Sequence, residues 1–131
     1  MKAVQVPPAK VGKAWPHIEH WVKAALVRGS DHTPDQIGLH LARGTMQLWI
    51  AWNDRPRGIC ITELIEGARG RHCNIVVVAG EAFDAWRHLE EDVAIWAALQ
   101  GCVRLEMTGR QGWVRRLRDW RPTLVRMEKE L

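Results

Sequence analysis

Apolar residues recur every three or four positions near the N-terminus. Residues 16–28 follow this period and predict an amphipathic helix that ends near Gly29. Thr33 and Pro34 then offer an N-cap and a first helical residue, so a second, shorter helix is expected to run to Gly44. A short strand over residues 3–6, stopped by two prolines, precedes the helices.

The pattern becomes strand-like after residue 45. Residues 46–52 are apolar, residues 58–65 roughly alternate between apolar and polar, and residues 72–79 contain an uninterrupted apolar run. Turn-forming residues separate the three segments. They predict an antiparallel meander whose last strand is buried on both faces.

The C-terminal part predicts a helix over residues 83–100, a strand over residues 102–107, a glycine-containing turn, and a helix over residues 113–120. In this last helix the side chains expected to face inward are those of Trp113, Val114, Leu117 and Trp120. Those expected to face outward are Arg115, Arg116 and Arg118. A final strand is expected over residues 122–127, which completes one domain over residues 1–131 with the order β-α-α-β-β-β-α-β-α-β.

Composition agrees with an α/β globular domain, since 47% of the 131 residues are hydrophobic and 26% are charged. The N-terminus lacks the apolar core of a signal peptide, and no apolar run is long enough to span a bilayer, so we expect a cytoplasmic protein without a membrane segment. Cys60, Cys73 and Cys102 are few and widely spaced, and they are expected to be buried thiols.

The net charge is +4, and arginines crowd the last 30 residues. Such a patch suits phosphate or nucleic acid, although a solvated helix face gives the same pattern. The chain has eight tryptophans and no tyrosine. It therefore lacks one common general acid.

Several stretches carry a family resemblance. They are Leu48-Trp49 before a turn and Gly58, the tryptophans Trp86 and Trp96, and the runs 101–106 and 109–117. Together they resemble the GNAT family of N-acetyltransferases, and most closely its short members from tailed bacteriophages. The resemblance covers the chain from about Trp15 onward. It implies a GNAT-like mixed, mainly antiparallel sheet flanked by helices.

The resemblance also implies an acetyl-CoA site. GNAT proteins hold the cofactor pyrophosphate on backbone amides where the fourth strand meets the next helix, and helix N-termini suit anions. Here that junction makes Val78, Gly80 and Ala82 the cofactor-binding residues. The family's glutamine or arginine falls on Val77, and Glu81 places a carboxylate where phosphate should lie.

Acetyl transfer needs a base for the amine and an acid for the thiolate. Glu63 and Glu66 are the candidate bases, and both also fit solvent-facing strand and turn residues. The family's tyrosine position falls on Trp113 or Val114, neither of which can protonate a thiolate. Metal binding is not expected, because the pair His17 and His20 has no obvious further ligand.

Three functions follow from these observations. The departures from the family pattern favour a catalytically degenerate phage-type protein, which would act as a virion-associated, assembly or binding protein. Its partner would be a phage or host protein, or a second copy of the chain. The alternative is an acyl-CoA-dependent N-acetyltransferase that uses acetyl-CoA. The second alternative is a nucleic-acid-binding protein that uses Arg115, Arg116 and Arg118.

Overall fold

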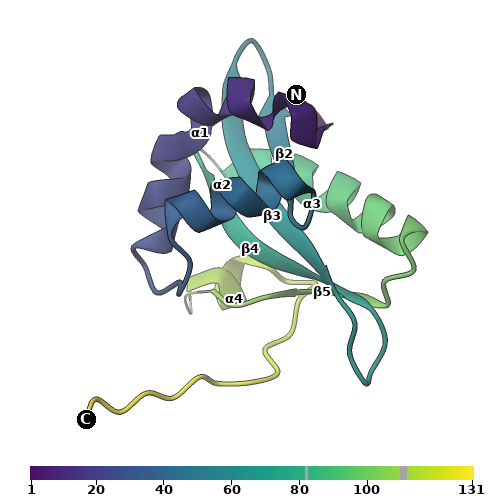
Figure 1. Cartoon of the computed structure of the whole chain (residues 1–131). Helices are drawn as coiled ribbons and strands as arrows, with labels where there is room; N and C mark the ends of the chain where they lie inside the picture. The colour runs from purple at the N-terminus through teal and green to yellow at the C-terminus, as the bar shows by residue number, and fades with distance from the viewer. Residues whose placement is uncertain (82, 110–111) are drawn as a thin grey trace.

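A five-stranded sheet separates two layers of helices in the computed structural model of the chain (Figure 1). The structure describes residues 1–81, 83–109 and 112–131. The strands lie in chain order: β1 (Lys2–Val6), β2 (Gln47–Trp52), β3 (Pro56–Ile65), β4 (His72–Gly80) and β5 (Arg104–Met107). Neighbours from β1 to β4 pair antiparallel, whereas β5 pairs parallel to β4. This confirms the predicted meander and the mixed, mainly antiparallel sheet.

Two helices, α1 (Val11–Leu26) and α2 (Pro34–Arg43), cover one face of the sheet, and a short turn of 3₁₀ helix, η1 (Pro8–Lys10), leads into α1. The helix α1 begins before the predicted start, so that Pro16 lies inside it. The predicted cap of α2 is confirmed. The Thr33 hydroxyl accepts from the Gln36 N–H at 3.2 Å, and the Gln36 side chain accepts from the Thr33 N–H at 2.9 Å.

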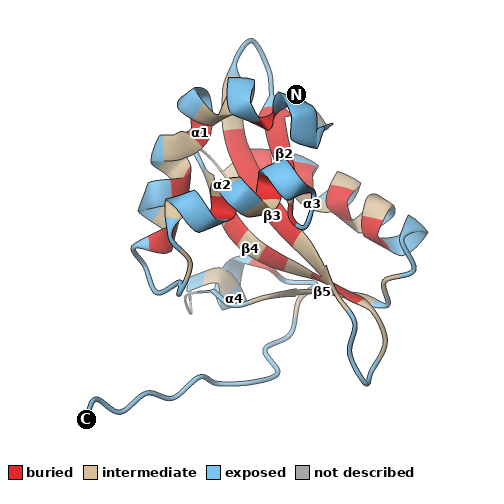
Figure 2. Cartoon of the chain, in the orientation of Figure 1, coloured by how far each residue is buried: buried red, intermediate tan, exposed pale blue. Residues whose placement is uncertain are grey.

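The fully buried residues between this face and the two helices are aliphatic apart from one methionine, and Trp15 and Trp21 pack against them partly buried. Its buried members are Val11, Ile18, Val22, Leu26, Ile37, Leu41, Met46, Leu48, Ile50, Ile59, Ile61 and Val77. The long helix α3 (Phe83–Leu99) covers the opposite face, where Trp49 and Trp86 are buried in a second core together with aliphatic residues, alanines and two thiols. Figure 2 shows the buried positions concentrated on the strands and on the inner sides of the helices.

The C-terminal segment differs from the prediction. The last helix, α4, spans only Gly112–Arg116, and Val114 is 52% exposed instead of facing inward. Leu117 is buried as expected, and Trp120 packs partly against the second core. The strand predicted over residues 122–127 is wrong, because residues 121–131 form no helix or strand and are all exposed. A strand needs a partner, and the described residues supply none to this segment.

The three cysteines are free thiols. Cys60 and Cys73 are buried as predicted, whereas Cys102, two residues before β5, is only partly buried. None of the helices in the described residues is both long and apolar enough to cross a bilayer.

Candidate functional site

The parallel strands β4 and β5 lie side by side over only part of their length. Their pairing runs from His72 opposite Arg104 to Ile75 opposite Met107, where β5 ends. The strand β4 continues to Gly80. Beyond Ile75, the edge of β4 that faces away from β3 therefore has no strand partner among the described residues.

A β-bulge in β4 lies at the level where the two strands part. Ile75 is opposite Thr62 and Val77 is opposite Ile61, which leaves Val76 as an extra residue in β4. A bulge bends the strand that carries it and increases its twist. We attribute the divergence of β4 from β5 to this extra residue.

A cleft of about 460 Å³ opens at the divergence. It is lined by β4 from Asn74 to Val78, by residues 107–109 that end β5, and by Trp113 of α4. Ala25 of α1, the loop between α1 and α2, and two C-terminal residues, Arg126 and Glu128, complete its lining. This volume lies within the range of small-molecule sites, about 300–1,000 Å³.

Backbone groups of β4 point to this open edge. The Glu81 N–H donates to the Arg57 carbonyl at 2.9 Å, so these two residues form a hydrogen-bonded pair of the β3–β4 ladder. Antiparallel strands direct alternate residues to opposite sides, and the backbone groups of Val78 and Gly80 therefore point away from β3. The structure thus places two of the three predicted cofactor residues along the open edge. The third, Ala82, lies outside the described residues.

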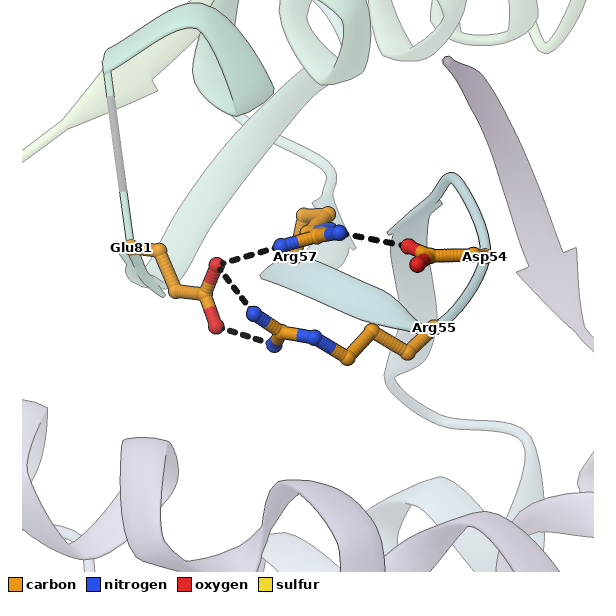
Figure 3. Close-up of polar contacts among 4 residues, drawn as sticks. All are labelled: Asp54, Arg55, Arg57 and Glu81. Atoms are coloured by element: carbon orange, nitrogen blue, oxygen red, sulfur yellow. Dashed lines mark hydrogen bonds and ion pairs between the residues drawn. The ribbon is translucent and has the colours of Figure 1, made fainter.

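Glu81, directly after β4, is the centre of an ion-pair cluster (Figure 3). Arg55 and Arg57 both donate to its carboxylate, the latter at 3.1 Å, and Arg57 also pairs with Asp54 at 2.5 Å. Hydrogen bonds from Arg55 and then Arg57 hold the pKa of Glu81 below its usual range. The carboxylate that we expected to repel phosphate is therefore already neutralised. Sequence reasoning missed both arginines, whose only signal was their place beside the turn before β3.

Gly80 has a φ of +159°, and a side chain at this position would point into the neighbouring strand. A Cβ atom added to it would lie 2.6 Å from the Gly58 Cα and 2.7 Å from the Arg57 carbonyl oxygen. Both contacts are to backbone atoms, which cannot rotate away as a side chain can. Only glycine therefore fits at this position without a shift of β3 or β4.

The two candidate bases have different surroundings. The Glu63 carboxylate accepts from the Asn74 side-chain amide at 3.0 Å, and Asn74 lines the cleft. Glu66 is exposed in the β3–β4 turn, where it pairs with Arg71, and it is not among the residues lining the cleft. Glu63 is not among the lining residues either, but it contacts one of them, Asn74, whereas Glu66 contacts Arg71, which does not line the cleft.

Aromatic residues support the α4 side of the cleft. The Trp113 ring packs 6.1 Å from the ring centroids of both Phe83 and Trp86. The Arg116 guanidinium lies 5.1 Å above the Phe83 ring, which is cation–π geometry. Arg115, Arg116 and Arg118 are exposed, as predicted. Their suggested anion or partner contacts stay a prediction.

A second polar cluster joins β4 and β5 before they diverge. The Glu106 carboxylate contacts Arg104 at 2.7 Å and His72 at 3.1 Å. The Arg104 hydrogen bond is the main cause that lowers the pKa of Glu106. Within the described residues, no group of three or more histidines, cysteines or carboxylates is arranged to hold a metal ion. His17 and His20 are both exposed.

No family model matches the chain, and no curated protein matches its sequence. Its structure, in contrast, is similar to solved acetyltransferases. An aminoglycoside acetyltransferase from an uncultured soil metagenomic sample, in complex with sisomicin, has a TM-score of 0.73 at 10% identity, covering 99% of this chain and 95% of that one.

Two further structures agree. A protein from Clostridium acetobutylicum, described as a predicted acetyltransferase and solved with acetyl-CoA, has a TM-score of 0.71 at 11% identity, covering 98% of this chain and 95% of that one. A GCN5-related N-acetyltransferase from Ralstonia eutropha JMP134 has a TM-score of 0.66 at 16% identity, covering 99% of this chain and 97% of that one. At these identities the similarity shows the fold alone. Together with the strand order and the divergence of β4 from β5, this similarity shows that the chain has a GNAT-like fold.

Proposed function

We propose that the chain binds an acyl-coenzyme A in the cleft between β4 and β5 and transfers the acyl group to an amine. The observation that carries this proposal is the open edge of β4 along the cleft. An arm that contains amide groups, such as pantetheine, can pair with a free strand edge in the manner of an added strand. The backbone groups of Val78 and Gly80 are the partners that we assign to it.

The walls of the cleft support this reading. Met107 and Trp113 line the cleft without filling it, since about 460 Å³ stays open. The lining also contains polar side chains, among them His32, Asn74 and Thr108, and polar groups in a ligand site fix the orientation of the ligand. The solved structure with acetyl-CoA that shares this architecture makes acetyl-CoA the first ligand to test.

For the transfer, we assign the base to Glu63. The acceptor nitrogen attacks the thioester carbonyl carbon, the carbon–sulfur bond breaks, and the amine proton passes to Glu63 directly or through water. Asn74 orients the carboxylate by its hydrogen bond. Because the chain has no tyrosine and Trp113 cannot release a proton, the departing thiolate takes its proton from solvent.

The second candidate is a protein that binds the cofactor or a partner without catalysis. The missing tyrosine and the position of Trp113 favour it. The phage and virion part of the sequence-based prediction has no support from the neighbours named above. It stays a prediction, as does nucleic-acid binding by the arginines of the C-terminal segment.

Thermal unfolding with and without acetyl-CoA tests the binding step. A ligand at a concentration of 100 times its dissociation constant stabilises the folded protein by about 2.7 kcal/mol. For a chain of this size this raises Tm by roughly 10 °C. Thr108→Trp should block the cleft that Thr108 lines, and the shift should vanish. Leu99→Trp, at the exposed end of α3, adds an aromatic ring elsewhere and should keep the shift. No shift for the unchanged protein at millimolar acetyl-CoA would overturn the proposal.

Release of the free coenzyme A thiol in the presence of a panel of amines tests the transfer step. Glu63→Gln can keep the Asn74 hydrogen bond but cannot take a proton, so the rate should fall at least 100-fold while acetyl-CoA still binds. The matched Glu66→Gln change should leave the rate unaltered. Acetyl-CoA binding without any amine-dependent release would favour the non-catalytic candidate.

A further inference from the structure

A row of three polar side chains crosses the sheet beside the cleft. In the register of the sheet, Asn74 of β4 is opposite Glu63 of β3 on one side and opposite Glu106 of β5 on the other. Residues opposite each other on neighbouring strands direct their side chains to the same face of the sheet. The three side chains therefore form one row, and its middle member, Asn74, lines the cleft.

This row lies on the face of the sheet that α1 and α2 cover. Side chains alternate between the two faces along a strand, and Cys73 and Leu105, which are adjacent in the chain to Asn74 and Glu106, belong to the core under α3. The helices do not bury the row, since all three of its residues are of intermediate exposure, and Figure 1 shows both helices lying away from β5. An acceptor can therefore reach the row from solvent, on the side of the cleft that the loop between α1 and α2 lines.

The Glu106 carboxylate is held in place and stays ionised. Arg104 donates to one of its oxygens at 2.7 Å, and the His72 Nε2 lies 3.1 Å from the other. The Arg104 hydrogen bond lowers the pKa of Glu106, so this group is an anion at neutral pH. A carboxylate has about four acceptor positions, and these two contacts occupy only part of them. The side chain is 42% exposed, so a ligand can reach the remainder.

The two carboxylates of the row are spaced for a ligand that spans one strand. Neighbouring strands lie about 4.8 Å apart, so the backbones of Glu63 and Glu106 are about 10 Å apart, with β4 between them. Both side chains lean toward β4, because Glu63 contacts Asn74 at 3.0 Å and Glu106 contacts His72. The two carboxylates can therefore hold the two ends of one short ligand. Charge-assisted hydrogen bonds from ammonium groups are the strong contacts that carboxylates make.

The arginine beside Glu106 allows the opposite preference to be considered. An acceptor with a carboxylate could bind Arg104, whose side chain is 24% exposed. This guanidinium, however, already donates to Glu106 and to the Arg69 carbonyl. His72 adds no positive charge, because its Nδ1 faces the Arg104 guanidinium at 3.3 Å and therefore accepts there. With two carboxylates and one guanidinium, the row and its contacts have an excess of negative charge, which favours a cation.

We propose that Glu106 is a specificity-determining residue that selects acceptor amines with a second positive charge, of which short diamines are the simplest class. This inference rests on the proposed transfer reaction. One nitrogen of the diamine, in its neutral form, attacks the thioester carbonyl carbon, the carbon–sulfur bond breaks, and this nitrogen gives its proton to Glu63. The thiolate takes a proton from solvent, and the other nitrogen stays an ammonium ion against Glu106. The products are the monoacetylated diamine and free coenzyme A.

Release of the coenzyme A thiol with matched amines tests this selection. Putrescine and butylamine have the same carbon chain, and only putrescine carries a second ammonium group. We expect kcat/KM to be at least ten times higher for putrescine, mainly through a lower KM. The amino alcohol of the same length should behave like butylamine. The amino acid of the same length should be the poorest acceptor, because its carboxylate would face Glu106.

Substitution of Glu106 tests whether its charge causes the preference. Glu106→Gln keeps an oxygen for the Arg104 hydrogen bond, and it should remove most of the advantage of putrescine by raising its KM. Glu91→Gln, on the exposed side of α3 and across the sheet, should leave the ratio of the two kcat/KM values unchanged. If Glu106→Gln does not fold, as circular dichroism would show, the comparison of the four acceptors with the unchanged protein still decides.

Three results would overturn the inference and leave the proposed transfer intact. Equal kcat/KM values for putrescine and butylamine would mean that the site does not recognise a second charge. An amino acid that is the best acceptor would mean that Arg104, and not Glu106, selects the substrate. A putrescine preference that survives Glu106→Gln would come from another group. Absence of thiol release with every amine would instead overturn the proposed transfer, and this inference with it.

Discussion

Replacing Gly80 by alanine tests whether the close approach of β3 and β4 is a real constraint on the site. The added Cβ would lie 2.6 Å from the Gly58 Cα and 2.7 Å from the Arg57 carbonyl oxygen, well inside ordinary contact distances. The two strands would have to separate, at the cost of ladder hydrogen bonds around the pair of Gly58 and Gly80. We therefore expect Gly80→Ala to behave as overpacking of a rigid site and to cost about 3 kcal/mol, the upper part of the usual range.

Urea unfolding followed by tryptophan fluorescence measures this cost. The midpoint should fall with an unchanged slope, and Tm should fall by roughly 10 °C. Gly12→Ala is the matched control, because nothing lies within 4 Å of a Cβ built at Gly12 in α1. It should be neutral or stabilise by up to about 1 kcal/mol.

The reasoning would be refuted if the free energy of unfolding of Gly80→Ala lay within about 0.5 kcal/mol of that of the unchanged protein, since neutral surface substitutions fall in this range. The two strands could then move apart at this point without a measurable loss of stability. If the expected loss is found, substitutions at Gly80 cannot be used to test acetyl-CoA binding, because they alter the fold itself.

Three further predictions concern single side chains. The buried Trp49 indole N–H donates to the Thr62 hydroxyl at 3.1 Å. Thr62→Val leaves this N–H without an acceptor and should lower the free energy of unfolding in urea by about 1–3 kcal/mol. An unchanged urea midpoint would contradict this. The lowered pKa of Glu81 means that its ion pairs stabilise the fold above the ordinary carboxyl pKa of about 4.3 and lose this contribution as pH falls through the lowered folded value. The stability curves of the unchanged protein and Glu81→Gln should therefore differ at neutral pH and converge in acid, and a constant difference would argue against the cluster. Burial raises the pKa of the Cys60 thiol strongly and that of Cys73 to about 12, so a thiol reagent at pH 8 should label the more accessible Cys102 first, and Cys102→Ser should remove the fast phase. Rapid labelling of that variant would show that the sheet opens readily.

The elements that the sequence predicts best are those with local signals. The helix α2 has its cap at Thr33, its proline at the first position and Gly44 in the left-handed conformation at its end. All three are properties of residues adjacent in the chain. The meander of β2, β3 and β4 is likewise marked by turns between apolar segments.

The opening that makes the site was not predictable in the same way. It depends on the extra residue Val76, which lies in the uniformly apolar run from Ile75 to Val78. Such a run has no alternation from which to read a register, so nothing in it marks a bulge. The ion pairs of Glu81 could not be predicted from local sequence either, because their arginines are 24 and 26 residues away in the chain.

The tail shows the converse case, in which local propensity is present and the partner is not. Thr123, Val125 and their neighbours suit a strand, and the prediction followed this preference. Strand formation is decided by the edge that is available, and the chain's own sheet leaves this segment exposed. The error therefore shows that local propensity does not make a strand where no pairing edge is occupied.

The departures from the GNAT pattern also change meaning once they are placed in three dimensions. Val77 occupies the family's glutamine or arginine position, and its side chain is 2% exposed within the aliphatic core. A long polar side chain would be costly there, so packing alone accounts for valine. The cluster around Glu81 balances two arginines with two carboxylates and offers a phosphate no net positive charge. Affinity for an acyl-coenzyme A would therefore have to come mainly from the cleft and the β4 backbone, and these are the parts of the site on which the proposed function rests.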